Sequence, residues 1–192
     1  MNAVVMMKPI HDPQVPLTES EISSPEFGFR ETHMVYGPYD ENALETALQL
    51  KDRFAIGVIA MIMAEDVPDD LLRQPLAVGA DQIIHIPYGS WSLSPLEVAH
   101  VLAQALQEVN DPGVILTGIQ SGDWDTGFVP MALAASLECG YVGHVTDIQR
   151  VDSQWHIWRR EANLTQHLVT DTLVVAAVTS SGRNNLRYHT MR

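Results

Sequence analysis

The residues best suited to chemistry lie in a short loop rich in glycine and carboxylates, residues 118–127 (GIQSGDWDTG). An apolar run before this loop predicts a strand, and an apolar run after it predicts a helix. The first N–H groups of a helix have no partner within it and carry partial positive charge, which favours a phosphate. Thr126 could add its hydroxyl. The loop is therefore either a phosphate seat or a crossover turn that holds no ligand, and these residues alone fit both.

The loop differs from the common phosphate-binding loops. It has no lysine, no Gly-Lys-Ser/Thr ending and no GxGxxG pattern. Asp123 and Asp125 would repel a phosphate directly. We expect these carboxylates to cap the following helix, to accept a ribose hydroxyl, or to hold the loop through its own N–H groups.

Other chemistries find less support in the sequence. The chain has eight histidines, but no two share one element at HxH or HxxxH ligand spacing. The single cysteine, Cys139, excludes an internal disulfide and a multi-cysteine metal site and is expected to be a small core residue. No Ser-His-Asp order with a nucleophile elbow is present. We therefore expect no metal and no residue that makes or breaks bonds.

Composition limits the partners. A formal net charge of −13 argues against nucleic acid and against an anionic membrane surface, since both need clustered Lys and Arg. No apolar stretch approaches the ~20 residues of a membrane span, and the first residues lack the basic start of a secretory signal. We expect one cytoplasmic domain, residues 1–192.

Apolar runs and amphipathic segments alternate along the first 140 residues. This order predicts right-handed β-α-β units, hence a doubly wound parallel sheet with helices on both faces. Residues 94–97 (SPLE) form a capping box with proline in the first turn, and Gly140 is expected to end the last helix in a left-handed conformation. Pro75 predicts a kink or an early end. The expected strands are 3–7, 56–63, 83–86 and 114–116, and the expected helices are 40–52, 68–79, 94–109 and 131–137.

Residues 141–192 have a different character. Strand patterns at 141–150, 154–164 and 173–178 follow one another without helices, and Asp152-Ser153 suits a hairpin turn. We therefore expect a C-terminal antiparallel strand extension. Trp155 and Trp158 should lie on opposite faces of a strand, one in the core and the other toward a partner. The long Pro-rich loop that ends at Phe29 is expected to be functional or covered by a partner.

Five segments, in order, resemble the β subunit of electron transfer flavoproteins, including its FixA-type members. Each alone is a weak motif, but together they span nearly the whole chain. The segments are residues 8–13 (KPIHDP), 37–45 (GPYDENALE), 76–86 (LAVGADQIIHI), 118–126 (GIQSGDWDT) and 184–188 (NNLRY).

The resemblance implies a Rossmann-like fold of the adenine nucleotide alpha hydrolase-like type. It also implies an electron carrier that pairs with an α subunit as a heterodimer, shuttles electrons through FAD and serves a flavin dehydrogenase or reductase. The α subunit would hold most of the FAD, and this chain would bind AMP or, as in electron-bifurcating members, a second FAD. The implied cofactor-binding residues are Met6, Lys8, Gly37, Tyr39, Met63, Ala64, Gln120, Gly122, Asp123, Asp125, Thr126, Gly127 and Val129.

Each implied residue also has a simpler interpretation. Met6 and Met63 would face the adenine, or they fill gaps in the core. Tyr39 would lie near the flavin, or it is an exposed tyrosine at a helix start. Ile119 stands where the family has a basic residue, and typical members continue beyond the position of Tyr188 into an arm that embraces the α subunit. The alternative function is a regulatory module of the same superfamily that senses an adenine nucleotide without a flavin.

Overall fold

The computed structural model describes residues 1–15, 19, 33–88 and 93–188. Most of the long loop that ends at Phe29 lies outside these residues, so the expectation for it stays a prediction.

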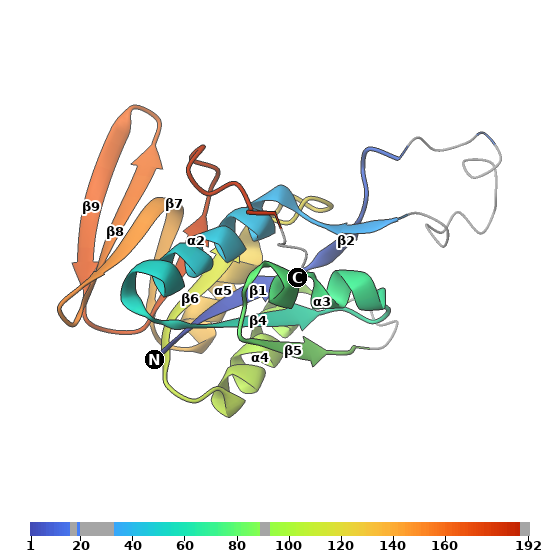
Figure 1. Ribbon diagram of the computed structural model, residues 1–192, viewed down its shortest axis with the longest axis horizontal. Helices are drawn as coiled ribbons and strands as arrows, with labels where there is room; N and C mark the ends of the chain where they lie inside the picture. The colour runs from blue at the N-terminus through green and yellow to red at the C-terminus, as the bar shows by residue number, and fades with distance from the viewer. Residues whose placement is uncertain (16–18, 20–32, 89–92, 189–192) are drawn as a thin grey trace.

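The main sheet has eight strands in the order β5-β4-β1-β6-β10-β7-β8-β9 (Figure 1). From β5 through β7 all neighbours are parallel, and the β7-β8 and β8-β9 pairs are antiparallel. The expected α/β fold with an antiparallel extension is confirmed. The strands are β1 (Asn2–Met7), β4 (Gly57–Met63), β5 (Gln82–Ile86), β6 (Pro112–Gly118), β7 (Gly140–Val151), β8 (Gln154–Glu161), β9 (Leu164–Thr170) and β10 (Val174–Val178).

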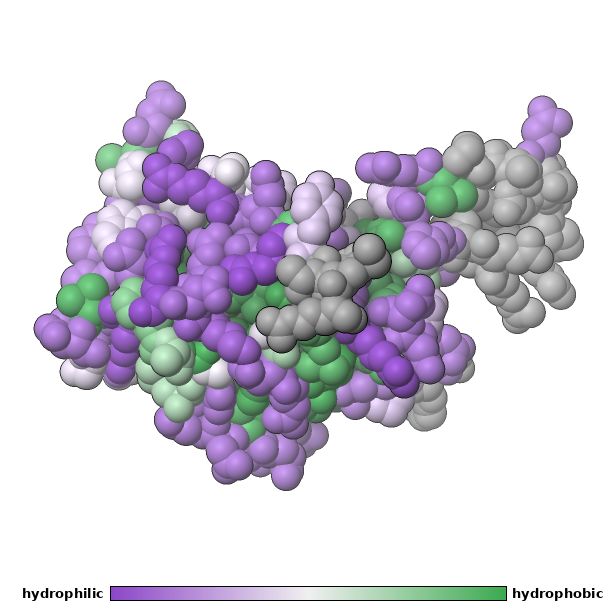
Figure 2. Space-filling model, in the orientation of Figure 1, coloured by the Kyte–Doolittle hydropathy of each residue, from purple (hydrophilic) through white to green (hydrophobic). Residues whose placement is uncertain are grey.

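Helices cover both faces of this sheet, as the strand–helix alternation predicts. On one face, α2 (Pro38–Phe54) and α3 (Asp69–Val78) pack on side chains such as Val5 and Leu116. On the other face, α4 (Pro95–Ala105), the short 3-10 helix η1 (Leu106–Glu108) and α5 (Phe128–Ser136) pack on Val4 and Ile115. Successive strand residues point to opposite faces, and both faces are covered, so the central strands are apolar throughout. Outside, hydrophilic side chains predominate on the face shown in Figure 2.

The structure differs from the expected elements in several details. Gly140 does not cap α5, because Glu138 adopts the left-handed conformation (φ 52°) and Gly140 already pairs with β10. The expected strand 154–164 is two strands, since Ala162, also left-handed, lies in a turn after which β9 begins. A two-stranded hairpin, β2 (Pro9–His11) with β3 (Met34–Tyr36), was not expected at all.

Pro75 does not end α3 early, because the helix continues to Val78. Proline has no N–H, so the carbonyl of Leu71, one helical turn earlier, loses its usual donor. The hydroxyl of Tyr36 replaces it, donating to that carbonyl at 3.1 Å. A tyrosine on β3 therefore makes the proline acceptable inside the helix.

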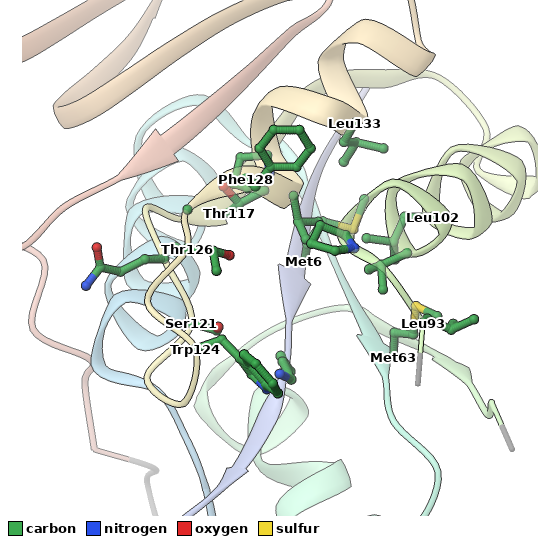
Figure 3. A pocket seen from close by; sticks show the side chains of 18 of the residues that line it. Met6, Met63, Leu93, Leu102, Thr117, Ser121, Trp124, Thr126, Phe128 and Leu133 are labelled. Carbon is green, nitrogen blue, oxygen red and sulfur yellow. The ribbon is translucent and has the colours of Figure 1, made fainter. Parts of the chain in front are cut away.

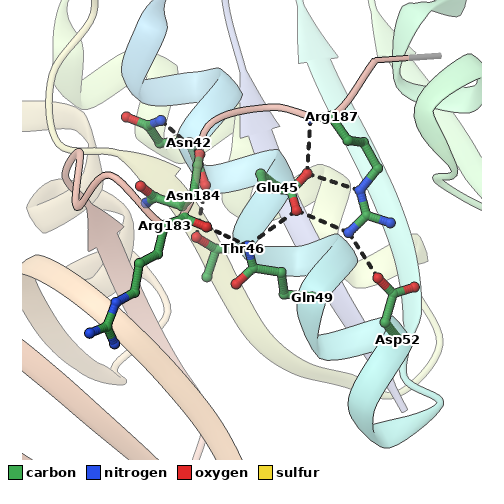
Figure 4. Close-up of polar contacts among 8 residues, drawn as sticks. All are labelled: Asn42, Glu45, Thr46, Gln49, Asp52, Arg183, Asn184 and Arg187. Atoms are coloured by element: carbon green, nitrogen blue, oxygen red, sulfur yellow. Dashed lines mark hydrogen bonds and ion pairs between the residues drawn. The ribbon is translucent and has the colours of Figure 1, made fainter.

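After β10 the chain crosses back over α2 (Figure 4). The Asn42 side chain donates to the carbonyl of Asn184 at 2.8 Å. The Arg187 guanidinium makes two hydrogen bonds to the Glu45 carboxylate, each at 3.0 Å, and a third to Asp52 at 2.8 Å. Glu45 is only 6% exposed, so its charge is paired where water hardly reaches it. These contacts fix α2, whose N-terminal end borders the site described next.

Candidate functional site

A cavity of about 560 Å³ opens at the carboxyl ends of β1, β4 and β6 (Figure 3). The strand ends reach it through Met6, Met63 and Thr117. From β1, the chain builds the sheet toward β4 and β5, then returns to place β6 on the other side of β1. Ligands of open α/β sheets bind at such a reversal of strand order. The cavity volume is within the range of small-molecule sites.

Apolar side chains form much of the cavity wall, and a buried threonine lies among them. Met6, Met63, Leu102 and Leu133 supply the apolar wall. The hydroxyl oxygen of Thr117, a residue only 5% exposed, has no hydrogen-bond partner among the described residues. A buried hydroxyl without a partner costs free energy, and a polar atom of a bound ligand would remove that cost. The wall thus suits a mostly apolar ligand that also has a polar atom for the Thr117 hydroxyl.

Helices α2, α4 and α5 begin at the cavity, and among these three only α4 has a side-chain cap. At α4, Ser94 and Glu97 form the expected capping box, with the Glu97 N–H donating to the Ser94 hydroxyl at 3.3 Å. At α5, no side chain caps the helix, whose N-cap is Gly127. Phe128 and Val129 therefore offer N–H groups to a ligand, while Pro130 has none. Neither Asp123 nor Asp125 caps α5.

The loop before α5 requires glycine at two places. Gly127 adopts φ 59°, and a Cβ there would lie 2.9 Å from the carbonyl oxygen of Ile119. At Gly118 a Cβ would lie 2.6 Å from a carboxylate oxygen of Asp40 and 2.9 Å from the Cβ of Tyr39. Strand β6 can therefore end directly against the start of α2 only because Gly118 has no side chain.

A carboxylate at the start of α2, Asp40, also lines the cavity and is 7% exposed. It accepts the backbone N–H of Lys8 at 3.0 Å. Burial raises the pKa of Asp40 to about 7, although backbone N–H groups of Lys8 and Gly118 act in the opposite direction. The sequence indicates an acid favourable to the helix dipole here, but its burial depends on β1 and β6 lying beside the helix.

Lys8 and Asp123 form an ion pair, with Nζ and Oδ2 2.5 Å apart. Partial burial acts to raise the pKa of Asp123, but hydrogen bonds from Lys8 and Ser121 and the charge of Lys8 outweigh it and hold that pKa below its usual value. Asp125 instead accepts the Gln120 side-chain amide at 2.9 Å. Asp123 thus joins the loop to Lys8, and it also accepts the backbone N–H of Trp124 as one of the alternatives predicts, whereas Asp125 is held by a side-chain amide.

The structure gathers about half of the candidate residues around the cavity. The candidates that do not line it are Gly37, Tyr39, Ala64, Gly122, Asp123 and Asp125. Two of them lie close by: Gly37 packs against Gly122, and Asp123 forms an ion pair with Lys8, which lines the cavity. The candidates that line it are Met6, Lys8, Met63, Gln120, Thr126, Gly127 and Val129.

Sequence reasoning missed several lining residues, among them Asp40, Thr117 and Trp124. The signal for Thr117 was its place as a polar residue at the end of an apolar strand. Trp124 stood within the candidate loop itself, and its side chain is 75% exposed.

Further expectations concern the rest of the chain. Trp155 is 1% exposed and belongs to the core, as one of the two tryptophans was expected to. Trp158 stacks on His167, with ring centroids 4.6 Å apart, and whether it faces a partner stays a prediction. Across the described residues, no helix is long and apolar enough to cross a membrane, and no three His, Cys, Asp or Glu gather as metal ligands.

Comparison with known proteins identifies the family to which the chain is similar. The family model for the electron transfer flavoprotein domain matches residues 29–186. Protein FixA of Azotobacter vinelandii is 29% identical over 80% of this chain and 57% of its own length. The mitochondrial electron transfer flavoprotein subunit beta of Arabidopsis thaliana is 40% identical over 54% of this chain and 41% of its own. The subunit beta of Megasphaera elsdenii is 29% identical over 82% of this chain and 61% of its own.

The match covers most of the chain, which therefore belongs to the electron transfer flavoprotein domain family. The relatives are β subunits and FixA proteins, so the resemblance drawn from the five segments is confirmed. The chain spans about half the length of the curated relatives it matches.

Proposed function

We propose that this chain is a β-type electron transfer flavoprotein subunit that binds an adenine nucleotide, AMP or FAD, in the cavity. It would pair with an α-type subunit and shuttle electrons through FAD to or from a flavin dehydrogenase or reductase. One observation carries the nucleotide part. In a chain of this family, an apolar cavity at the strand ends contains a buried Thr117 hydroxyl without a partner, beside the uncapped start of α5.

Different residues of the cavity would bind the adenine and the phosphate of such a ligand. The adenine would lie against Met6, Met63 and Leu133, with a polar edge toward the Thr117 hydroxyl. The phosphate would lie at the free N–H groups of Phe128 and Val129, where the helix start favours negative charge. FAD supplies one-electron chemistry when it is bound. The part of this chain is to bind, to orient and to exclude water.

The first test is to purify the chain alone, denature it and identify any released nucleotide by absorbance and mass. Calorimetry with AMP, ADP, ATP and FAD then measures binding to the emptied protein. Release or binding of AMP or FAD supports the proposal and distinguishes the two ligands. If nothing is released and no ligand gives heat, the proposed nucleotide site is wrong.

A pair of matched variants tests where the nucleotide binds. Leu102 lines the cavity, while Leu106, just after it on η1, is equally buried at 4% exposure but lies outside the lining. Leu102→Phe narrows the cavity and should weaken nucleotide binding about tenfold or more, while Leu106→Phe should leave affinity within about twofold, since both cause similar overpacking. Equal effects would place the ligand elsewhere.

Pairing is tested separately by co-expression with an α-type subunit. A yellow complex that elutes as one species supports the electron carrier. Binding of AMP or ATP by a chain that pairs with no α subunit and acquires no flavin would instead favour the regulatory module.

A further inference from the structure

Positive charge is scarce around the cavity. Among the described residues that line it, Lys8 is the only one with a basic side chain, whereas Asp40 and Glu97 are acidic. Lys8 directly follows β1, where the chain leaves the sheet beside the loop that precedes α5. Of the lining residues that the structure describes, Lys8 alone can therefore offer a side-chain cation to a phosphate in the cavity.

This cation is already occupied by an anion of the chain. Its Nζ lies 2.5 Å from Oδ2 of Asp123, with the two side chains 40% and 33% exposed. Water screens an ion pair so exposed, and the pair contributes little to stability. A phosphate that carries two charges and approaches the same ammonium can therefore take it from the Asp123 carboxylate.

The ion pair also holds a well-defined turn. The other carboxylate oxygen of Asp123 accepts the N–H of Trp124 at 3.0 Å, and the N–H of Asp125 donates to the carbonyl of Ser121 at 3.1 Å. This turn presents the Trp124 indole at the border of the cavity (Figure 3). A change at Asp123 thus reaches Trp124 through a direct hydrogen bond.

We infer that Lys8 is the side chain that recognises the ligand's phosphate, and that Asp123 is a built-in competitor that holds Lys8 until a phosphate replaces it. The inference rests on the proposed nucleotide site and explains how that site would distinguish a nucleotide from a nucleoside without a phosphate. Base and ribose bind without disturbing the ion pair, and a phosphate must displace Asp123. The strength of the Lys8–Asp123 pair therefore sets how much a phosphate adds to the affinity.

The test measures the affinity of adenosine and of AMP for each variant by calorimetry. In Asp123→Asn, Lys8 is released and a repelling charge is lost, so the ratio of AMP affinity to adenosine affinity should rise about fivefold. In Lys8→Met the ratio should fall to what the N–H groups of Phe128 and Val129 alone provide, and adding Asp123→Asn to that variant should not restore the contribution of Lys8. Asp125→Asn is the matched control, because it removes the same charge from the same turn but from a carboxylate that accepts from Gln120.

Trp124 gives a second readout. In wild type, AMP should change the indole fluorescence that Trp124→Phe removes, whereas adenosine should change it much less. In Asp123→Asn the signal should resemble that of the AMP-bound wild type before any ligand is added.

Three outcomes would overturn the inference. If Asp123→Asn and Asp125→Asn raise the ratio of AMP affinity to adenosine affinity equally, the cause is the loss of one negative charge and not the release of Lys8. Adenosine binding with an AMP ratio unchanged by Lys8→Met would exclude Lys8 and leave the nucleotide site standing. Absence of adenosine and AMP binding in every variant would remove the inference, and if FAD also gives no heat it would remove the proposed nucleotide site as well.

Discussion

The Thr117 hydroxyl should lower the stability of the fold and strengthen the binding of a ligand in the cavity. Its hydroxyl is buried at the cavity wall without a partner in the described chain, and valine has the same shape without the hydroxyl. Thr117→Val should raise the free energy of unfolding by about 1 kcal/mol, because a buried unsatisfied hydroxyl is removed. The same change should weaken nucleotide binding roughly fivefold to tenfold, by about one hydrogen bond. Denaturant unfolding and calorimetry measure the two effects.

Thr46 provides the control for this prediction. It is 6% exposed, but its hydroxyl donates to the carbonyl of Asn42 at 2.7 Å. Thr46→Val should therefore lower stability and leave nucleotide affinity unchanged. If both variants shift stability in the same direction, the Thr117 hydroxyl has a partner after all.

Asp40 makes stability depend on pH in an unusual direction. Its pKa is about 7 in the folded state, against about 3.9 for an unperturbed aspartate. Between these values the folded state binds more protons than the unfolded state, so the contribution of Asp40 is complete below pH ~4 and is lost as pH rises to about 7. In Asp40→Asn this dependence is absent. The stability of wild type relative to the variant should therefore fall by about 2 to 4 kcal/mol from pH 4 to pH 8.

Unfolding in urea at several pH values measures this difference, since groups that titrate in both proteins cancel. A difference that stays constant with pH would mean that Asp40 is ionised throughout. Asp40 and Thr117 also show how much of the site can be predicted from the sequence. The types of Asp40 and Thr117 are visible in the sequence, but their burial depends on strands and a helix that meet only in three dimensions.

Among the elements, α2 depends on an ion pair made by the segment after β10. Arg187→Met would leave Glu45, 6% exposed, without a cation, although the Gln49 amide and the backbone N–H of residue 187 still donate to it, each at 3.1 Å. An unpaired buried carboxylate is costly, so the free energy of unfolding should fall by about 2 to 3 kcal/mol. Arg183→Met, an exposed change four residues earlier, should stay within about 0.5 kcal/mol. Equal losses would show that general charge, and not the pair with Glu45, matters here.

The elements that the sequence predicted well carry local signals. The capping box at Ser94 sets the start of α4 whatever surrounds it, and the uninterrupted apolar runs of β1 and β4 match strands covered on both faces. β9 was missed because its side chains are nearly all exposed and no alternation of burial marks it. β2 and β3 were missed because they pair across more than twenty residues, a distance that no local pattern spans. Elements with a local sequence signal, such as β1, β4 and α4 beside the cavity, could therefore be predicted, whereas β2, β3 and β9, which form through pairing with other strands, could not.

Over the whole molecule, burial decreases from the centre of the sheet to one edge. All five residues of β10 are buried, and so are Val4 and Val5 of β1. In β9 six of seven residues are exposed, and its outer edge has no neighbouring strand among the described residues. The antiparallel extension is anchored at its base, where the indole N–H of Trp155 donates to the carbonyl of Gly113 at 3.0 Å.

Hydrogen exchange should follow this gradient. Amides of β1, β6 and β10 can open only when the shared core opens, so they should exchange through global unfolding. Amides of β9 lose only exposed contacts when the strand detaches, and they should exchange on the order of a hundredfold faster or more. Trp155→Phe removes the anchoring bond and should speed exchange in β8 and β9 more than in β1. Equal protection of β9 and β1 in wild type would instead mean that the extension and the part of the sheet around the cavity unfold as one unit, so that a ligand in the cavity would protect both alike.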